Sequence, residues 1–249
     1  MNQQSPAKVC WLDLENSPIL AYVWENYETN VLWKERDWYI MSYSVKWDDG
    51  RKETLALPDF PLYKREPFND KELVKRLWKI FDEADIIIGH NSIAFDEKKA
   101  NTRFIAHGLP PPSPFRSIDT LKAARQIGKA TSNKLDDLCQ DLGIGKKVPH
   151  TGKNLWRECI AGDLKQWAVM KRYNQHDVYL CEQLYHYLKP WIKNHPNLRL
   201  WDGRVGCPVC GSQNVMRRGL EHKLKDYDVR RLSCKDCGKN YYGDRIKRL

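Results

Sequence analysis

The segment VCWLDLE, residues 9–15, joins a short apolar run to two carboxylates. The apolar half has the composition of a buried β-strand. Because side chains alternate between the two faces of a strand, Asp13 and Glu15 should lie on the same face as Trp11. Carboxylates at the end of a buried strand are costly unless they protonate or find a cation. The segment therefore predicts a core strand that ends in a functional site.

Two further carboxylates stand where an ordinary fold would not place them. Asp96 closes the segment GHNSIAFD, residues 89–96, just after a second apolar strand. Asp177 lies on the core-facing stripe of the last long helix, which comprises Tyr173, Asp177, Leu180, Leu184 and Leu188. Taken alone, Asp96 could pair with a neighbouring lysine and Asp177 with Arg172. Four carboxylates together would repel one another, and two divalent ions about 4 Å apart, an arrangement that suits phosphoryl hydrolysis, would relieve that repulsion.

The pattern along the chain predicts an α/β fold with a mixed sheet. A strand over 38–47, a turn at Asp48-Asp49-Gly50 and a return strand over 54–57 follow the first strand. Further strands are predicted over 85–89 and 115–118, alternating with helices. Helices are predicted over 70–84, 95–107, 119–127, 134–142, 162–171 and 172–189, and residues 143–153 form a basic loop.

The order of these motifs resembles that of the DEDD 3′–5′ exonucleases, which share the DnaQ-like variant of the ribonuclease H fold. The resemblance covers about residues 7–192 and is closest to the polymerase-B-proofreading-like and phage-type members. It rests on Asp13-Leu14-Glu15, on Gly89-His90-Asn91 with Phe95-Asp96, and on Tyr173 four residues before Asp177. One branch of the family has a histidine five residues before the last aspartate, where this chain has Arg172, so the chain resembles the tyrosine branch.

This resemblance implies an α/β, ribonuclease H-like mixed β-sheet flanked by helices. It also implies a catalytic site that binds two Mg²⁺ or Mn²⁺ ions. The residues that would hold the ions are Asp13, Glu15, Asp96 and Asp177.

Tyr173 and Asp177 are an i,i+4 pair, so their side chains should converge on one helix face. The phenol could then orient the attacking water without ionising. The alternative is a tyrosine that is merely packed in the core.

Several other residues have two interpretations. His90 and Asn91 could line the nucleotide site, or Asn91 could cap the helix that follows. Asp119 is interpreted as a helix cap rather than a fifth metal ligand. Lys147 and His150 could approach phosphates, or they could belong to a solvated basic loop.

The eight cysteines divide into four scattered ones and two C-x-x-C pairs, Cys207/Cys210 and Cys234/Cys237. Each pair is followed by glycine, as in zinc knuckles, and four thiolates form a closed structural Zn²⁺ site. The alternatives are a redox dithiol or disulfides. We therefore divide the chain into residues 1–195, an exonuclease domain, and residues 196–249, a basic zinc-ribbon module.

The formal net charge of +10 suggests a polyanionic partner, and the uneven distribution of this charge along the chain indicates where the partner would bind. Residues 199–249 hold 13 Lys/Arg and 6 Asp/Glu, a net of +7. Basic residues interleaved with aromatics suit single-stranded nucleic acid, and the alternative is a ribbon that docks on a protein. The candidate contacts are Arg217, Arg218, Arg230 and Arg231.

The composition argues against a disordered chain and against a membrane-spanning protein. An apolar fraction of 41% argues against a disordered chain, and no apolar run approaches the roughly 20 residues that span a bilayer. The N-terminal residues do not resemble a signal peptide, so a cytoplasmic protein is expected, in the bacterial host cell if it is phage-encoded.

The preferred hypothesis is a metal-dependent 3′–5′ exonuclease that converts single-stranded DNA ends to 5′-mononucleotides, with any polymerase partner acting in trans. The alternatives are an RNA-trimming exonuclease, a structure-specific endonuclease of the same fold, and a non-catalytic nucleic-acid-binding adaptor.

Overall fold

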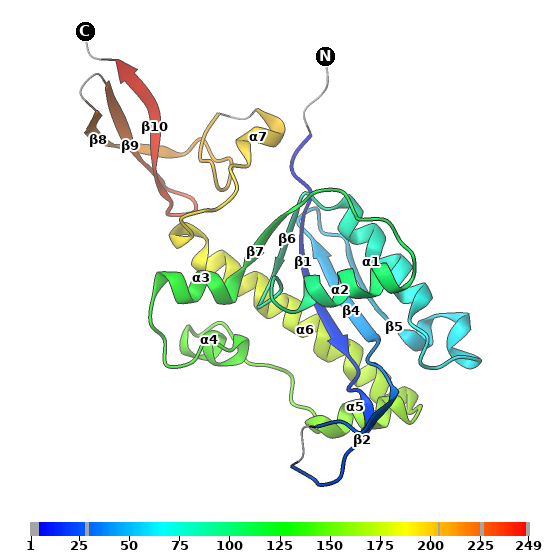
Figure 1. Cartoon of the computed structure of the whole chain (residues 1–249). Coiled ribbons are helices and arrows are strands. Elements are labelled where there is room, and N and C mark those ends of the chain that lie inside the picture. The colour runs from blue at the N-terminus through cyan, green and yellow to red at the C-terminus, as the bar shows by residue number, and fades with distance from the viewer. Residues whose placement is uncertain (1–4, 28–29, 204, 225–226, 248–249) are drawn as a thin grey trace.

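The computed structural model describes residues 5–27, 30–203, 205–224 and 227–247. Its main sheet has five strands in the order β5-β4-β1-β6-β7 (Figure 1). The central strand β1 runs parallel to β6, which runs parallel to β7, whereas β4 and β5 continue antiparallel on the other side. The strand bounds are β1 (Val9–Asn16), β4 (Ile40–Trp47), β5 (Lys52–Ala56), β6 (Ile86–Gly89) and β7 (Arg116–Asp119). The mixed α/β fold predicted from the sequence is confirmed.

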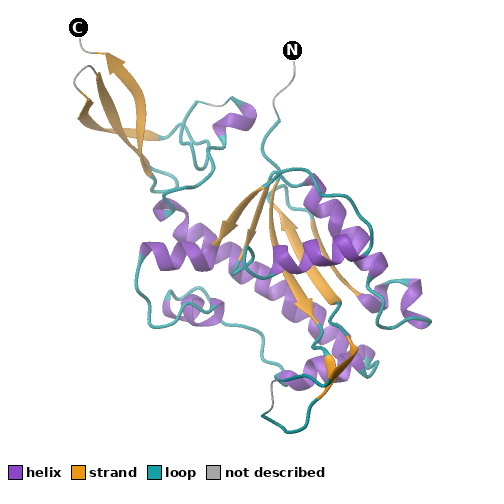
Figure 2. Ribbon diagram, in the orientation of Figure 1, coloured by secondary structure: helices purple, strands orange, loops and turns teal. Residues whose placement is uncertain are grey.

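Helices cover both faces of this sheet (Figure 2). Their bounds are α1 (Lys71–Glu83), α2 (Asp96–Ala106), α3 (Thr120–Ile127), α4 (Leu135–Asp141), α5 (Lys153–Ile160) and α6 (Leu164–Leu188). Leu12 and Leu14 of β1 pack in the apolar cluster that contains α1 and α2, and Trp11 packs in the cluster that contains α3, α4 and the end of α6. The alternation of strand β1 places Asp13 and Glu15 on the face of Trp11, as predicted, and that face is turned toward α6.

Helix α6 corrects the prediction of two helices over 162–171 and 172–189. It is one helix of 25 residues, capped by the Asp163 carboxylate, which accepts from the backbone N–H groups of Lys165 and Gln166. No glycine or proline occurs between Leu164 and Leu188, so nothing interrupts the helical hydrogen bonds at the charged pair Lys171-Arg172. Helix α6 is therefore long enough to carry the site and also to reach the C-terminal module.

Several smaller elements were not predicted. Helix α5 begins at Lys153, inside the segment interpreted as a basic loop. Strands β2 (Leu20–Tyr22) and β3 (Trp33–Arg36) form a separate two-stranded sheet just after β1. Tyr22 and Trp33 pack against each other across it, with ring centroids 4.9 Å apart.

The C-terminal part forms a second, three-stranded sheet in the order β10-β9-β8, which we call the ribbon. Its strands are β8 (Val215–Leu224), β9 (Tyr227–Cys234) and β10 (Asn240–Lys247), preceded by the short helix α7 (Arg199–Asp202). The ribbon lies beyond the C-terminal end of α6 (Figure 1). There Lys239 donates to the carbonyl oxygen of Ile192, and the hydroxyl of Tyr185 lies 2.7 Å from Nε2 of His195. The boundary at residues 195 and 196 stays a prediction.

Among the described residues, no helix is both long and apolar enough to cross a membrane.

Candidate active site

Three carboxylates meet between strand β1 and helix α6. Ligand oxygens of Asp13, Glu15 and Asp177 all lie within 4.8 Å of one another. Asp13 and Glu15 come from the end of β1, and Asp177 is a buried residue in the second half of α6. The structure therefore brings together three of the four predicted acids in one cluster.

Asp96 adjoins this cluster without belonging to the group of three. It is the first residue of α2, and its Oδ1 accepts from the backbone N–H of Leu14 at 3.1 Å. That hydrogen bond ties the carboxylate to the backbone of β1 at the residue between Asp13 and Glu15. The turn that delivers Asp96 depends on Gly89, because a Cβ there would lie 2.5 Å from Cβ of Ser92 and 3.2 Å from the carbonyl oxygen of Leu12.

Burial raises the pKa values of all four acids, and repulsion from the other carboxylates of the cluster adds to this effect at Asp13 and Glu15. Burial, and then the Asp96, Glu15 and Asp177 carboxylates, raise the pKa of Asp13 well above its usual range. Burial and the Asp177 carboxylate raise the pKa of Glu15 to about 8. Burial raises the pKa of Asp96 to about 7 despite its hydrogen bond from Leu14. A cation placed among these groups would offset the repulsion, so the cluster has the electrostatics of a cation site.

Lys147 lies inside the site. Its Nζ donates to Oδ2 of Asp177 at 2.5 Å and to the hydroxyl of Tyr173 at 2.9 Å. Burial alone would lower the pKa of Lys147, but Asp177 and Tyr173 raise it above its usual range, so the ammonium stays charged. Its backbone N–H donates to Oδ1 of Asp136, which holds this part of the loop against α4. The structure places Lys147 beside the carboxylates, and its approach to a phosphate stays a prediction.

Tyr173 is buried one helical turn before Asp177. His150 and Trp156 pack edge-on against its ring, with centroids 4.6 Å and 6.1 Å from it. Burial and the Asp177 carboxylate raise the pKa of Tyr173, so the phenol keeps its proton. Its hydroxyl accepts from Lys147 beside the carboxylate cluster, and a catalytic role for Tyr173 stays a prediction.

Sequence reasoning missed Asn174, which is fully buried on α6. Its Nδ2 donates to the side chain of Asp13 at 2.5 Å and to the backbone carbonyl of Asp13 at 3.2 Å, while its Oδ1 accepts from Ser42. Asn174 lies three residues before Asp177, on the same helix face, so a buried polar residue at that spacing was the signal. It holds Asp13 in its orientation.

We expect Asn174→Ala to weaken divalent-metal affinity by about 10- to 100-fold, as loss of a group that orients a metal ligand does. Hydrolysis measured against Mn²⁺ concentration should show a shifted midpoint with recovery at saturating metal. Gln175→Ala, an exposed neighbour on the same helix, is the matched control. An unchanged metal midpoint in Asn174→Ala would exclude this positioning role.

His90 and Asn91 line a cleft of about 630 Å³ that also contains Asp13, Lys147 and Asp177. Nε2 of His90 donates to the carbonyl of Asn133, and its Nδ1 lies 2.9 Å from the Thr120 hydroxyl. His90 therefore joins β6 to α3 and to the loop before α4, and forms one wall of the cleft.

The helix-cap interpretation of Asn91 is wrong. Helix α2 begins at Asp96 with Phe95 in the cap position. Asn91 instead has φ 64° and donates its backbone N–H to Oδ1 of Asp119. The cap interpretation of Asp119 is confirmed, because its carboxylate also accepts from the backbone N–H groups of Leu121 and Lys122.

The carboxylate cluster fits a hard divalent cation. Oδ1 of Asp177 is buried and has no hydrogen-bond partner among the described residues. All the donors are carboxylate oxygens, which Mg²⁺ and Mn²⁺ prefer. The orphaned oxygen and the donor set together support the divalent metals usual for this class of site.

The four cysteines Cys207, Cys210, Cys234 and Cys237 form a second cluster. Two of their sulfur–sulfur separations are 3.6 Å, well beyond a disulfide bond and close to the roughly 3.8 Å edge of a tetrahedron with Zn–S bonds of about 2.3 Å. Burial raises the pKa of Cys234, but backbone N–H groups of Cys237 and Asp236 lower it to about 7. The cluster is thus compatible with a zinc ribbon, and the zinc ion itself stays a prediction.

The predicted arginine contacts divide in the structure. Arg218 and Arg231 line a pocket on the ribbon, and Arg217 and Arg230 are exposed outside it.

A mixed five-stranded sheet with acids at the end of its central strand and on a facing helix defines the class of the protein as an RNase H-like fold with a carboxylate site. The sequence pattern of the RNase H superfamily matches residues 19–189. The chain belongs to the RNase H superfamily. The match begins after Asp13 and Glu15, so these two acids are assigned by the geometry of the cluster and not by the match.

The fold is also similar to a solved structure, that of the family B DNA polymerase from the hyperthermophilic archaeon Pyrobaculum calidifontis, at 20% identity and a TM-score of 0.56. The similar part covers 82% of this chain and 26% of the polymerase chain. No curated protein matches this sequence. The superfamily and the carboxylate cluster together support a nuclease.

Proposed function

We propose that the protein is a metal-dependent 3′–5′ exonuclease acting on single-stranded DNA ends. The observation that carries the proposal is the cluster of Asp13, Glu15 and Asp177 with Asp96 beside it, in a cleft that also contains Lys147. The likeness of the fold to a family B DNA polymerase supports DNA as the substrate. A polymerase acting in trans is the partner that this likeness suggests.

Each residue of the site has a role in this proposal. Asp13, Glu15, Asp96 and Asp177 would together hold the two divalent ions. When bound, the two ions activate a water molecule and stabilise the leaving oxygen. Lys147 places a fixed positive charge beside the phosphodiester, because Asp177 and Tyr173 keep its ammonium protonated. Tyr173 orients the nucleophilic water through its protonated hydroxyl.

The product distribution tests this function. With Mg²⁺, a 5′-labelled single-stranded DNA should shorten stepwise, and a uniformly labelled strand should release 5′-mononucleotides. A matched RNA strand and a branched DNA separate the alternatives. Cleavage only of RNA, only at branch points, or of none of these would refute the proposal, the last in favour of a binding protein.

Tyr173→Phe removes one oxygen and leaves the packing against His150 and Trp156 intact. We expect the cleavage rate to fall by about 10²-fold, as for a positioned proton donor or acceptor, while the affinity for a single strand changes little. Single-turnover cleavage and fluorescence anisotropy measure the two quantities. The matched control is Tyr179→Phe, an exposed tyrosine on the same helix. Equal cleavage rates would make Tyr173 purely structural.

A further inference from the structure

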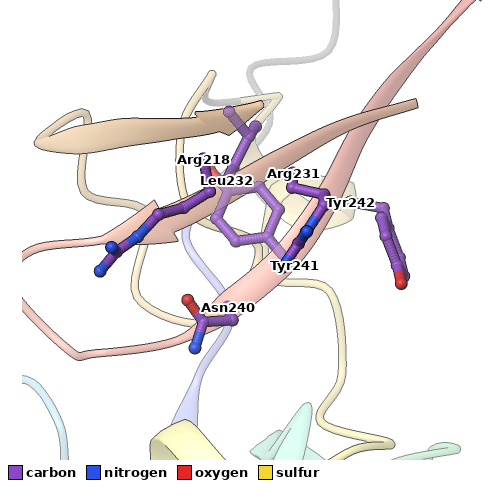
Figure 3. A pocket seen from close by; sticks show the side chains of 6 residues that line it. All are labelled: Arg218, Arg231, Leu232, Asn240, Tyr241 and Tyr242. Atoms are coloured by element: carbon purple, nitrogen blue, oxygen red, sulfur yellow. The ribbon is translucent and has the colours of Figure 1, made fainter. Parts of the chain in front are cut away.

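The ribbon has a pocket that the carboxylate site does not use. It measures about 440 Å³, within the range of ligand pockets, and we call it the distal pocket. Strand β8 contributes Arg218, strand β9 contributes Arg231 and Leu232, and strand β10 contributes Asn240, Tyr241 and Tyr242. Figure 3 shows the Tyr241 ring at the centre, with the two arginine side chains on either side of it and Asn240 below.

Irregular strand pairing forms this pocket. Tyr241 pairs with Leu232, and Tyr242 pairs with Arg231. The register then shifts between Tyr242 and Arg245 on one side, and between Arg217 and Leu220 on the other. Bulges of this kind redirect side chains and increase the local twist. Arg218 lies inside the second shift and lines the pocket, whereas its neighbour Arg217 does not.

Gly243 lets strand β10 approach the side chain of Leu232 at the edge of the pocket. A Cβ at this position would lie 2.9 Å from Cδ1 of Leu232. Since that is closer than carbon atoms pack, a side chain at 243 would displace the side chain of Leu232, which lines the pocket.

The chemistry of the lining selects an anionic ligand with a ring. The six residues include two guanidinium groups and no acid. A guanidinium group presents paired N–H donors that match phosphate oxygens. Tyr242 is 52% exposed, and such a ring can stack on a base whatever its identity. A phosphate next to a base is found in nucleic acid. The strand must be single, because a base stacked in a duplex does not expose its face to a protein ring.

The position of the pocket sets a length requirement. Asp177 and Leu188, the end of α6, are separated by about 17 Å at 1.5 Å per residue. The ribbon lies beyond that end, where Lys239 contacts Ile192 (Figure 1). At the stacked rise of about 3.4 Å per nucleotide, a stacked strand that contacts both sites needs at least about five nucleotides.

We propose that the distal pocket binds the phosphodiester backbone and a base of single-stranded nucleic acid, about five or more nucleotides from the end held at the carboxylates. This proposal deepens the proposed function, because it names the substrate class and the part of the substrate that the ribbon holds. Arg218 and Arg231 bind phosphates, and Tyr242 stacks on a base. Short ends then reach the carboxylates without help from the ribbon, and long strands are held at two points.

The binding test compares two double variants that remove the same charge. Arg218→Gln/Arg231→Gln alters the pocket, and Arg217→Gln/Arg230→Gln alters their exposed sequence neighbours outside it. Both are made in the Asp177→Asn background, and anisotropy measures their affinity for a twenty-nucleotide oligothymidine. The pocket variant should bind about 10-fold more weakly than the control variant. The slope of log affinity against log salt concentration should also be smaller by about 1.4 in the pocket variant. Each of the two phosphate contacts that it loses contributes about 0.7 to that slope on a single strand.

Equal losses in the two double variants would show a diffuse basic surface and overturn the proposal. Unchanged affinity in both double variants would also overturn the proposal. An acidic protein segment would then be the ligand to test at the pocket. A metal content equal to that of the unaltered ribbon in both variants confirms that each is folded.

Hydrolysis separates this proposal from the proposed function. In the chain with intact carboxylates, Arg218→Gln/Arg231→Gln should lower kcat/KM about 10-fold on the twenty-nucleotide strand and leave it unchanged on a trinucleotide. Equal losses on both lengths would overturn the distal position of the contact. If the unaltered protein hydrolyses neither strand, the proposed function fails, and the binding comparison alone decides the pocket.

Discussion

Asp177→Asn should lower the rate of DNA hydrolysis by about 10³-fold. Asp177 provides one of three carboxylates whose oxygens lie within 4.8 Å, and its Oδ1 has no other partner among the described residues. Metal ions in such sites supply several kcal/mol of transition-state stabilisation, and each 1.36 kcal/mol is tenfold in rate. Asp13→Asn should have an effect at least as large, since Asp13 adjoins all three other acids.

The same variants should fold normally, which distinguishes a catalytic loss from a structural one. Burial and the other carboxylates raise the pKa of Asp13, so a neutral side chain relieves repulsion in the metal-free protein. We expect the melting temperature of Asp13→Asn to be equal to or higher than that of the unaltered protein. Mg²⁺ or Mn²⁺ stabilises the unaltered protein by mass action, about 2.7 kcal/mol at a hundredfold excess over Kd, and should stabilise Asp13→Asn much less.

Asp141→Asn is the matched control, because Asp141 is an exposed acid at the end of α4 outside the cluster. It should keep both the hydrolysis and the metal-induced rise in melting temperature. Undiminished hydrolysis by Asp13→Asn and Asp177→Asn would remove the carboxylate cluster from the mechanism.

The parts of the site that follow from local periodicity were predictable from the sequence. The two-residue period of β1 gives the face of Asp13 and Glu15, and the helical stripe gives Asp177. Both rules depend on neighbours in the chain. The apolar partners of those faces then determine where the acids point, and the sheet order brings the two elements together.

Lys147 and Asn174 show where sequence reasoning ends. Lys147 is one of several basic residues in its loop, and only the folded chain brings its ammonium to Asp177, 30 positions later. Asn174 adjoins the predicted tyrosine and could have been found as a buried polar residue on the helix stripe. Its contact with Asp13, 161 positions earlier, required the packing of α6 against β1. Such long-range pairs have no local pattern.

The pairing of the ribbon strands was equally beyond sequence reasoning. The sequence indicated Arg217, Arg218, Arg230 and Arg231 as equivalent basic residues. Adjacent residues of a strand point to opposite faces, and the structure shows that Arg218 and Arg231 are the two that line the distal pocket. A shift of one residue in a strand reverses the face of a side chain, and composition contains no information about it.

Cys234→Ser should reduce zinc from about one ion per chain to nearly none. Two sulfur–sulfur separations of 3.6 Å match a tetrahedral Zn²⁺ site, and three thiolates hold the ion far less tightly than four. The ribbon should lose its fold as well, because its buried cluster consists of Cys207, Val209 and Cys234, too small a core to support three strands. Elemental analysis measures the ion, and hydrogen exchange measures protection of strands β8 to β10.

Cys139→Ala is the matched control, a buried cysteine of the nuclease core outside the four-cysteine cluster. It should keep its zinc and the protection of the ribbon. Since α6 and the sheet are stabilised by their own apolar clusters, Cys234→Ser should still hydrolyse a trinucleotide while losing affinity for a long strand. Full zinc content in Cys234→Ser would exclude the four-cysteine site, and unchanged protection without zinc would show that the ribbon folds by packing alone.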